Sequence, residues 1–303
     1  MNAQAVPVVT SDSILSELHK LAPTAQRALA TDFARAFLAR VPVEELEQHE
    51  PAEWAATLLS NFEFAMQREP GRASVRVFNP AAGAGFGSGA TVVQMVNDDM
   101  SFLVDSVGMA LAGHGLSSHG IVHPVFPISR DAAGKLVAIG SGEPESLIQI
   151  LVDRVGSEAD MASLRESILA ALADVRSAFG DWQAMRGKME TVAEEIGSRR
   201  MPASAETRAE AQEFLRWAAD NHFTFLGYRE YEVCERDGKR VLAAVPGTSL
   251  GIMRGHDAEA KPRALVFLQR GLDGVDHQVG AFFRGVDGVE AQVRARFVGG
   301  FGR

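Results

Sequence analysis

Two adjacent carboxylates, Asp98 and Asp99, are the residues whose type and placement best suit binding chemistry. They follow a β-branched segment and precede an apolar helical pattern, so they lie where a strand ends and a helix begins. Backbone N–H groups at a helix N-terminus suit a carboxylate, and Asp98 can pair with an ammonium group. These groups match the two charged ends of a free amino acid. The candidate site consists of Asn97, Asp98, Asp99, Met100 and Ser101.

The same residues also have a purely structural interpretation. Asp and Ser are common helix N-caps, so Asp99 or Ser101 can simply begin the helix. Capping uses only one residue, which leaves a second role for Asp98. Asp105, one turn into the helix, either shares the site or faces solvent. The sequence leaves both interpretations open.

Other arrangements that often carry chemistry are weaker here. His119 and His123 are four residues apart, but in a strand this separation spans about 13 Å, too far for one metal ion. Pro124 supports the extended conformation, because proline disfavours helix at the preceding residue. The glycine-rich residues 83–89 lead into a strand, which favours a linker over a phosphate-binding loop. Cys234 has no base nearby in sequence, so we predict neither a catalytic residue nor a metal site.

The elements that position the candidate site follow from the spacing of apolar residues. Helical periodicity covers residues 12–21 and 23–38, and Pro51 opens a third helix. Residues 73–78 are extended. Residues 1–70 are therefore predicted to form a helical N-terminal unit.

The next segment predicts a sheet around the candidate site. Residues 91–96 form its first strand, and a helix with one apolar face follows at residues 103–111. Further strands are predicted at residues 118–128, 135–139 and 146–155, with a turn at residues 131–134. This βαβ unit with an added antiparallel portion predicts an open sandwich over residues 71–156.

A heptad seam replaces the strand pattern in residues 157–203. Its apolar residues alternate steps of three and four, which indicates either one long helix or two antiparallel helices joined at Gly180. The unbroken seam favours one bent helix, begun by a capping box of Ser157 and Asp160. The seam is expected to pack against another helix, in this chain or in a second copy. Its members are Met161, Leu164, Ile168, Ala171, Val175, Ala178, Trp182, Met185, Met189, Val192 and Ile196.

Residues 204–263 predict the beginning of a second α+β domain. A capping box of Thr207 and Glu210 is expected to begin its helix. Residues 222–233 are then predicted to form a strand, which turns at residues 236–238 and returns to residue 245.

The segment 264–303 differs from the rest of the chain. It contains eight glycines and no Lys, Ser, Thr, Asn or Pro. Its apolar content is unlike that of an ordinary solvated tail. A shifted reading frame or a truncated domain would explain this atypical segment.

The composition argues against some classes of binding partner. Hydrophobic residues make up 46% of the 303 residues, and the net charge is −9. This charge argues against general attraction to nucleic acid or to an anionic membrane. One cysteine excludes an internal disulfide, and the N-terminus shows no export signal, so a cytoplasmic location is expected.

Three blocks of the sequence resemble the N-terminal region of the large bacterial NAD-specific glutamate dehydrogenases. The likeness covers about residues 25–263. The blocks are FARAFLARVP at residues 33–42, VQMVNDDMSFLVDSV at residues 93–107, continued at residues 115–116 and 121–125, and EFLRWAADNHFTFLGYR at residues 213–229, continued at residues 244–252.

The resemblance implies a regulatory region built from ACT-type domains, which are small βαββαβ modules that often bind amino acids. In that family the oxidoreductase domain and its NAD site lie far downstream, so no cofactor is expected in this chain. An ACT module ends with a helix and a fourth strand. Here the long helix follows the sheet, and no closing strand is evident.

The predicted fold is α+β: a helical N-terminal unit, an ACT-like βαβ sandwich, a long heptad helix or helix pair, and the start of a second α+β domain. One functional hypothesis is a regulatory fragment that binds an amino-acid effector. The other is a scaffold that joins subunits, for example by self-association through the seam. With neither interpretation is the chain alone expected to oxidise glutamate.

Overall fold

The computed structural model describes residues 9–81, 85, 89–198, 203–236, 239–254 and 263–264. The chain divides into two compact units, Met1–Val175 and Arg176–Arg303. The boundary between them falls within the long helix α6 (Glu158–Ser198).

The first unit begins with helices, as the apolar spacing predicts. They are α1 (Ser11–Leu21), the 3-10 turn Thr24–Gln26, α2 (Arg27–Leu38), the short α3 (Val43–Leu46) and α4 (Pro51–Ala65). The Thr10 hydroxyl accepts a hydrogen bond from the Ser13 N–H and so caps α1. Pro51 stands in the first turn of α4, where its missing N–H costs nothing.

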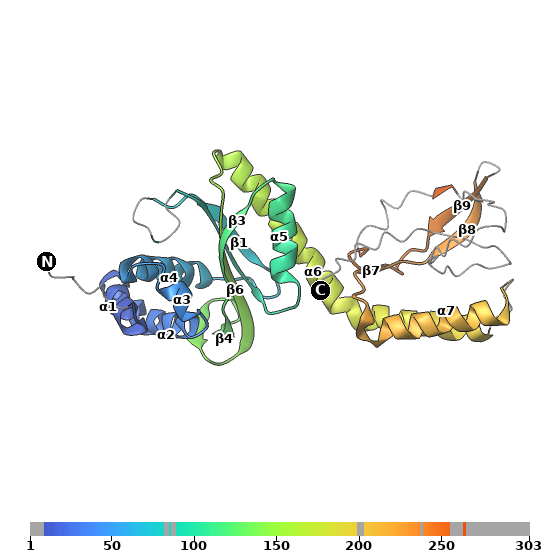
Figure 1. The fold of residues 1–303 in the computed structure, drawn as a ribbon, viewed down its shortest axis with the longest axis horizontal. Coiled ribbons are helices and arrows are strands. Elements are labelled where there is room, and N and C mark those ends of the chain that lie inside the picture. The colour runs from blue at the N-terminus through green and yellow to red at the C-terminus, as the bar shows by residue number, and fades with distance from the viewer. Residues whose placement is uncertain are drawn as a thin grey trace. The chain divides into compact units, whose positions relative to one another are not determined.

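A six-stranded antiparallel sheet follows. Its strands are β1 (Ser74–Phe78), β2 (Thr91–Asp98), β3 (Ser118–Val122), β4 (Val125–Arg130), β5 (Leu136–Ile139) and β6 (Glu143–Val152). The order is β1-β2-β6-β4-β5, and β3 also pairs with β6. Figure 1 shows this sheet between the N-terminal helices and α5. The central strands β2 and β6 pair along their length, from Thr91 opposite Val152 to Asp98 opposite Glu145.

Strand β1 closes the sheet edge for which no closing strand was evident in the sequence. It pairs antiparallel with β2, with Ser74 opposite Val96 and Phe78 opposite Val92. A strand that precedes the βαβ unit in the chain therefore occupies the position beside β2. The predicted βαβ unit of β2, α5 (Leu103–Gly113) and β3 is present, with β6 lying between its two strands.

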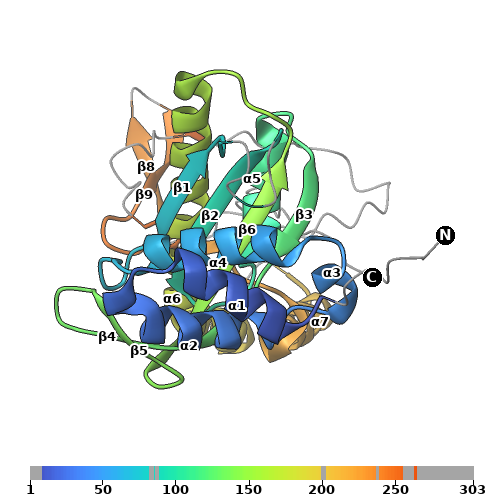
Figure 2. The same cartoon turned by 90° about the vertical axis from the view of Figure 1, so that its left-hand side faces the viewer.

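The N-terminal helices pack on one face of this sheet (Figure 2). Phe33 of α2 makes edge-on ring contacts with Phe62 of α4 and Phe126 of β4, each at 5.6 Å between ring centroids. Leu147 of β6 and Val96 of β2 lie in the same core. Helices and sheet are thus stabilised by one shared apolar cluster.

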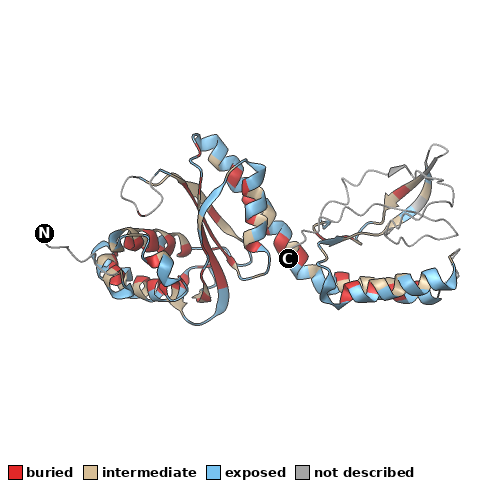
Figure 3. Cartoon of the chain, viewed as in Figure 1, coloured by how far each residue is buried: buried red, intermediate tan, exposed pale blue. Residues whose placement is uncertain are grey.

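Helix α5 and the first half of α6 cover the opposite face. Their side chains Leu103, Val107, Leu164 and Ile168 form a second core with alternate residues of β2 and β6, among them Val93. Both strands are buried on both faces (Figure 3). This burial explains why the middle of β2 and the second half of β6 are apolar on both faces apart from Gln94 and Gln149.

The seam belongs to one continuous helix of 41 residues, so the single-helix prediction is confirmed and the helix-pair alternative is wrong. The predicted N-terminal cap is present, because the Ser157 hydroxyl accepts from the Asp160 N–H at 3.1 Å. Six of the eleven seam residues are buried within the chain, and four more are partly buried. Trp182 departs from the pattern, with 38% of its surface exposed.

In the second unit, α7 (Ala205–Trp217) packs on the second half of α6. Ala193 and Ile196 of α6 and Leu215 of α7 form its buried cluster, flanked by Met189. A π-helical turn (Ala218–His222) and short strands follow. The strands are β7 (Gly227–Tyr228), β8 (Tyr231–Arg236), β9 (Lys239–Ala244), β10 (Leu250–Gly251) and β11 (Arg263–Ala264).

Three predictions in these regions are corrected. The cap of α7 is Ser204, whose hydroxyl accepts from the Thr207 N–H at 3.1 Å, and not Thr207 itself. Residues 222–233 are not one strand, because the π-helical turn reaches His222 and strands begin only at Gly227 and Tyr231. The strand predicted at residues 118–128 is interrupted at His123 and Pro124, where proline has no N–H to donate.

Other predictions concern residues outside the described ranges. These are most of the glycine-rich run at residues 83–89, part of the turn at residues 236–238, and the atypical segment beyond Ala264. None of the helices that the structure describes is both long and apolar enough to cross a membrane.

Candidate functional site

The candidate site lies where β2 ends and α5 begins, but its first two residues, Asn97 and Asp98, are still part of β2. Asn97 pairs with Ser146 and Asp98 with Glu145 on β6. Successive strand residues point to opposite faces. Asn97 therefore lies on the buried side shared with α5, and Asp98 on the side of the N-terminal helices. The polar turn predicted from Asn97 begins only after Asp98.

Neither Asp99 nor Ser101 caps α5, which corrects the capping interpretation. The N-cap position is Phe102, in the left-handed conformation at φ 68°, and no side chain of the described residues accepts a hydrogen bond there. Asp99 instead accepts from the Ser146 hydroxyl at 2.7 Å, and its N–H donates to the Pro144 carbonyl at 3.1 Å. Asp99 is thus tied to β6 while remaining exposed.

The remaining site residues differ in exposure. Met100 is partly buried against the second core, whereas Ser101 is exposed. Asp105 is also exposed, one turn into α5. The structure therefore brings Asp99, Met100 and Ser101 together at the start of α5 and separates Asp98 from them.

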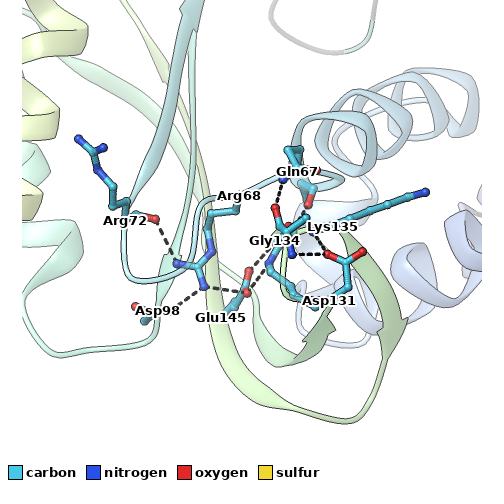
Figure 4. Close-up of polar contacts among 11 residues, drawn as sticks. Gln67, Arg68, Arg72, Asp98, Asp131, Gly134, Lys135 and Glu145 are labelled. Carbon is cyan, nitrogen blue, oxygen red and sulfur yellow. Dashed lines mark hydrogen bonds and ion pairs between the residues drawn. The ribbon is translucent and has the colours of Figure 1, made fainter.

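Asp98 belongs to a group of four charged side chains, here called the Glu145 cluster and consisting of Arg68, Asp98, Arg130 and Glu145. Arg68, Arg130 and Glu145 are buried, whereas Asp98 is 35% exposed. Figure 4 shows Arg68 joined to Asp98 and Glu145. Arg68 Nη2 donates to Asp98 Oδ1 at 2.6 Å and to Glu145 Oε1 at 2.9 Å. Arg130 binds Glu145 through two bonds, Nε to Oε1 at 2.7 Å and Nη2 to Oε2 at 2.8 Å. The two guanidinium groups balance the two carboxylates.

The same arginines also hold backbone carbonyls. Arg130 Nη1 donates to the carbonyls of Ala65 and Gly134, both at 2.9 Å. The Arg68 N–H donates to the Gly134 carbonyl at 3.0 Å. Gly134 has φ 83°, and a Cβ atom there would lie 1.9 Å from the Arg68 carbonyl oxygen, so this close approach requires glycine. The cluster anchors the end of α4 and the β4–β5 turn to β2 and β6.

A second polar layer fixes α4 on the sheet. Gln149 Oε1 accepts from Asn61 Nδ2 of α4 at 2.8 Å and from Gln94 Nε2 of β2 at 2.9 Å. Arg76 Nε of β1 donates to Gln94 Oε1 at 3.1 Å. Buried amides paired in this way specify one position of helix on sheet, because an unpaired amide would be costly.

The two histidines singled out in the sequence have different partners. His119 Nε2 lies 2.7 Å from Asp153 Oδ1, and His123 Nε2 lies 3.1 Å from Ser146 Oγ. Within the described ranges, no group of three His, Cys, Asp or Glu side chains is placed to hold a metal ion. Cys234 is a half-buried free thiol on β8.

His123 is expected to make the stability of the first unit depend on pH. Desolvation lowers the pKa of its imidazole, and the charge of Asp99 opposes this shift. The unfolded chain then binds a proton more readily than the folded one, so stability should fall as the pH falls through about 6.5. Denaturant titrations from pH 8 to 5 should show a smaller loss for His123→Gln than for the wild type. An unchanged loss would contradict this. His114→Gln controls for removal of a histidine, because His114 is exposed and also contacts a serine hydroxyl, Ser167 Oγ at 2.9 Å.

The sheet and its helices form an α+β module, and its sequence matches a family of ACT type. Residues 33–168 match the family model described as the ACT1 domain of glutamate dehydrogenase. The matched range includes α4 and the sheet and ends within α6.

Curated relatives extend the similarity beyond that domain. The chain is 36% identical over 257 residues to the NAD-specific glutamate dehydrogenase of Halomonas elongata, covering 82% of this chain and 16% of the relative. It is 33% identical over 221 residues to that of Pseudomonas aeruginosa, covering 70% and 14%. The chain is homologous to the N-terminal portion of the large NAD-specific glutamate dehydrogenases, as its sequence blocks indicate. It spans about a sixth of these relatives' length.

Sequence reasoning missed Arg68, Arg130 and Glu145. Arg68 and Glu145 are 77 residues apart, and only the sheet brings them together. One signal was available: Glu145 stands two residues before Leu147, the first apolar residue of the buried part of β6, and a buried carboxylate needs a paired cation.

Proposed function

We propose that this chain is a regulatory region of a large NAD-specific glutamate dehydrogenase and that it binds a free amino acid at the start of α5. The observation that carries the proposal is the match of residues 33–168 to an ACT1 domain. The matched range contains the polar turn that connects β2 to α5. Resemblance to ACT modules supports an amino-acid ligand.

Two features support the start of α5 as the position of the ligand. The first turn of α5 presents backbone N–H groups that no side chain of the described residues caps, and these suit the α-carboxylate. Asp99 is exposed beside them and suits the α-ammonium group. Asp98 suits it less well, because Asp98 lies on the opposite face of β2 with Arg68.

In this proposal the rest of the longer protein supplies catalysis. It would bind NAD and convert glutamate to 2-oxoglutarate and ammonia in the cytoplasm, while the present chain contributes allosteric control. The purified chain should accordingly give no NADH from glutamate and NAD.

One observation favours the second candidate function, which is a scaffold for subunit assembly that binds no amino-acid effector. The Glu145 cluster gives Asp98 a structural partner, so that carboxylate has a function without any ligand. Burial of the seam within the chain means that such assembly would use other surfaces.

Calorimetry with a panel of amino acids tests the proposal. The wild type should release or absorb heat with at least one of them. Asp99→Asn should weaken binding by about tenfold or more, because a hydrogen bond to a charged group is lost. Asp98→Asn should lower the melting temperature through the Glu145 cluster and leave the affinity nearly unchanged. If no amino acid gives heat or a thermal shift at millimolar concentration, sensing is excluded and the scaffold function stands.

A further inference from the structure

The second unit contains a charged pocket that the sequence did not predict. Its volume is about 260 Å³, just below the range of roughly 300–1,000 Å³ usual for sites of drug-sized ligands, so a smaller molecule suits it. It lies between α6 and the end of α7 with the π-helical turn. The lining residues are Arg186, Glu190, Glu194, Arg216, Ala219 and Asp220.

One wall of the pocket is a single face of α6. Arg186, Glu190 and Glu194 are spaced four residues apart and therefore lie in a row along the helix. Arg186 Nε donates to Glu190 Oε1 at 3.1 Å, so these two charges satisfy each other. The carboxylate of Glu194 has no such partner among the residues that the structure describes.

The other wall carries Arg216 and Asp220, again four residues apart. Neither side chain makes an ion pair or hydrogen bond within the described part of the chain. Apart from the internal pair on α6, the pocket therefore offers one guanidinium group and two carboxylates, those of Arg216, Glu194 and Asp220.

The backbone around Asp220 adds to the negative side of the pocket. The helix leaves regular geometry there, with Asp220 at φ −85° and ψ 52° and Asn221 left-handed at φ 58°. The last carbonyl groups of a helix and the negative end of its dipole favour a cation. π-helical turns of this kind occur frequently at functional sites.

We propose that this pocket binds a free α-amino acid as its zwitterion. Arg216 holds the α-carboxylate, because a guanidinium group matches a carboxylate with two parallel hydrogen bonds. Glu194 and Asp220 hold the α-ammonium group. The buried Ala219 provides a small apolar surface beside them. This site shares no residue with the one at the start of α5 and stands whether or not that site binds.

The test is equilibrium dialysis of L-alanine against the whole chain carrying Asp99→Asn, which removes the contribution expected at α5. Binding should persist in that variant. Adding Arg216→Gln or Asp220→Asn should reduce affinity tenfold or more, whereas Glu213→Gln, an exposed change on α7 outside the pocket, should not. Propionate and ethylamine should each bind far more weakly than alanine, because each meets half of the charges.

The outcomes separate the two sites. Loss of binding on Asp99→Asn alone would place the ligand at α5 and overturn the pocket proposal. Binding that both Arg216→Gln and Asp220→Asn leave unchanged would also overturn it. Both pocket side chains are exposed, so unchanged melting temperatures should show that the variants remain folded.

Discussion

Replacing Glu145 by Gln should destabilise the chain by about 3–5 kcal/mol, the range for breaking a buried ion pair on one side. Glu145 is 2% exposed and accepts three hydrogen bonds from Arg68 and Arg130. Glutamine keeps the shape but removes the charge, and its amide nitrogen would face a guanidinium group. Denaturant unfolding should report the loss in free energy of unfolding.

Glu69→Gln is the matched control. Glu69 pairs with Arg72 on the surface at 3.2 Å, and both side chains are largely exposed. Exposed pairs contribute little, so this change should stay within about 1 kcal/mol of the wild type. Equal effects of the two substitutions would show that the Glu145 cluster does not anchor the helices to the sheet.

Replacing Ile168 by Asp should cost about 4 kcal/mol or more and cause the first unit to unfold at lower temperature. Ile168 of α6 is fully buried against α5 and the sheet, where a carboxylate would have neither water nor a cation as partner. Melting followed by circular dichroism would measure the effect.

Ala170→Asp places the same side chain on the exposed side of α6 and controls for helix propensity. It should change the melting temperature only slightly. Met189→Asp should have an intermediate effect in the second unit, because Met189 is only partly buried against the α7 cluster. A tolerated Ile168→Asp would mean that the seam is not a packing surface.

The helices were predictable because their signals are local. Pro51 begins α4 as its fixed φ requires, and Ser157 caps α6 three residues before Asp160. The apolar spacing of the seam continues without a shift across Gly180 and Gly187. Because each glycine costs a helix only about 1 kcal/mol, the chain forms one helix there.

Strand ends were less predictable, because pairing with a distant strand decides them. Asn97 and Asp98 have low strand propensity, yet both continue β2, since β6 presents Ser146 and Glu145 opposite them. The extension moves Asp98 to the face of the N-terminal helices. Its pairing with Arg68 follows from that tertiary register and had no local signal.

The cap of α5 shows the same limit at the candidate site. Asp99 has the residue type and position of an N-cap, but its carboxylate accepts a hydrogen bond from the Ser146 hydroxyl of β6 instead. Phe102 then occupies the cap position in a conformation that bulky residues rarely adopt. Residue types predicted the candidate site, and only the sheet could show that Asp99, and not Asp98, lies at the start of α5.

Hydrogen exchange of backbone amides, measured with and without a saturating amino acid, tests the proposed regulatory function most directly. Binding at the start of α5 should slow exchange at residues 99–105, with the largest change in the uncapped first turn of the helix. In Asp99→Asn the same slowing should require about ten times more amino acid or more. Unchanged exchange at residues 99–105 in the presence of every amino acid tested would contradict the proposal.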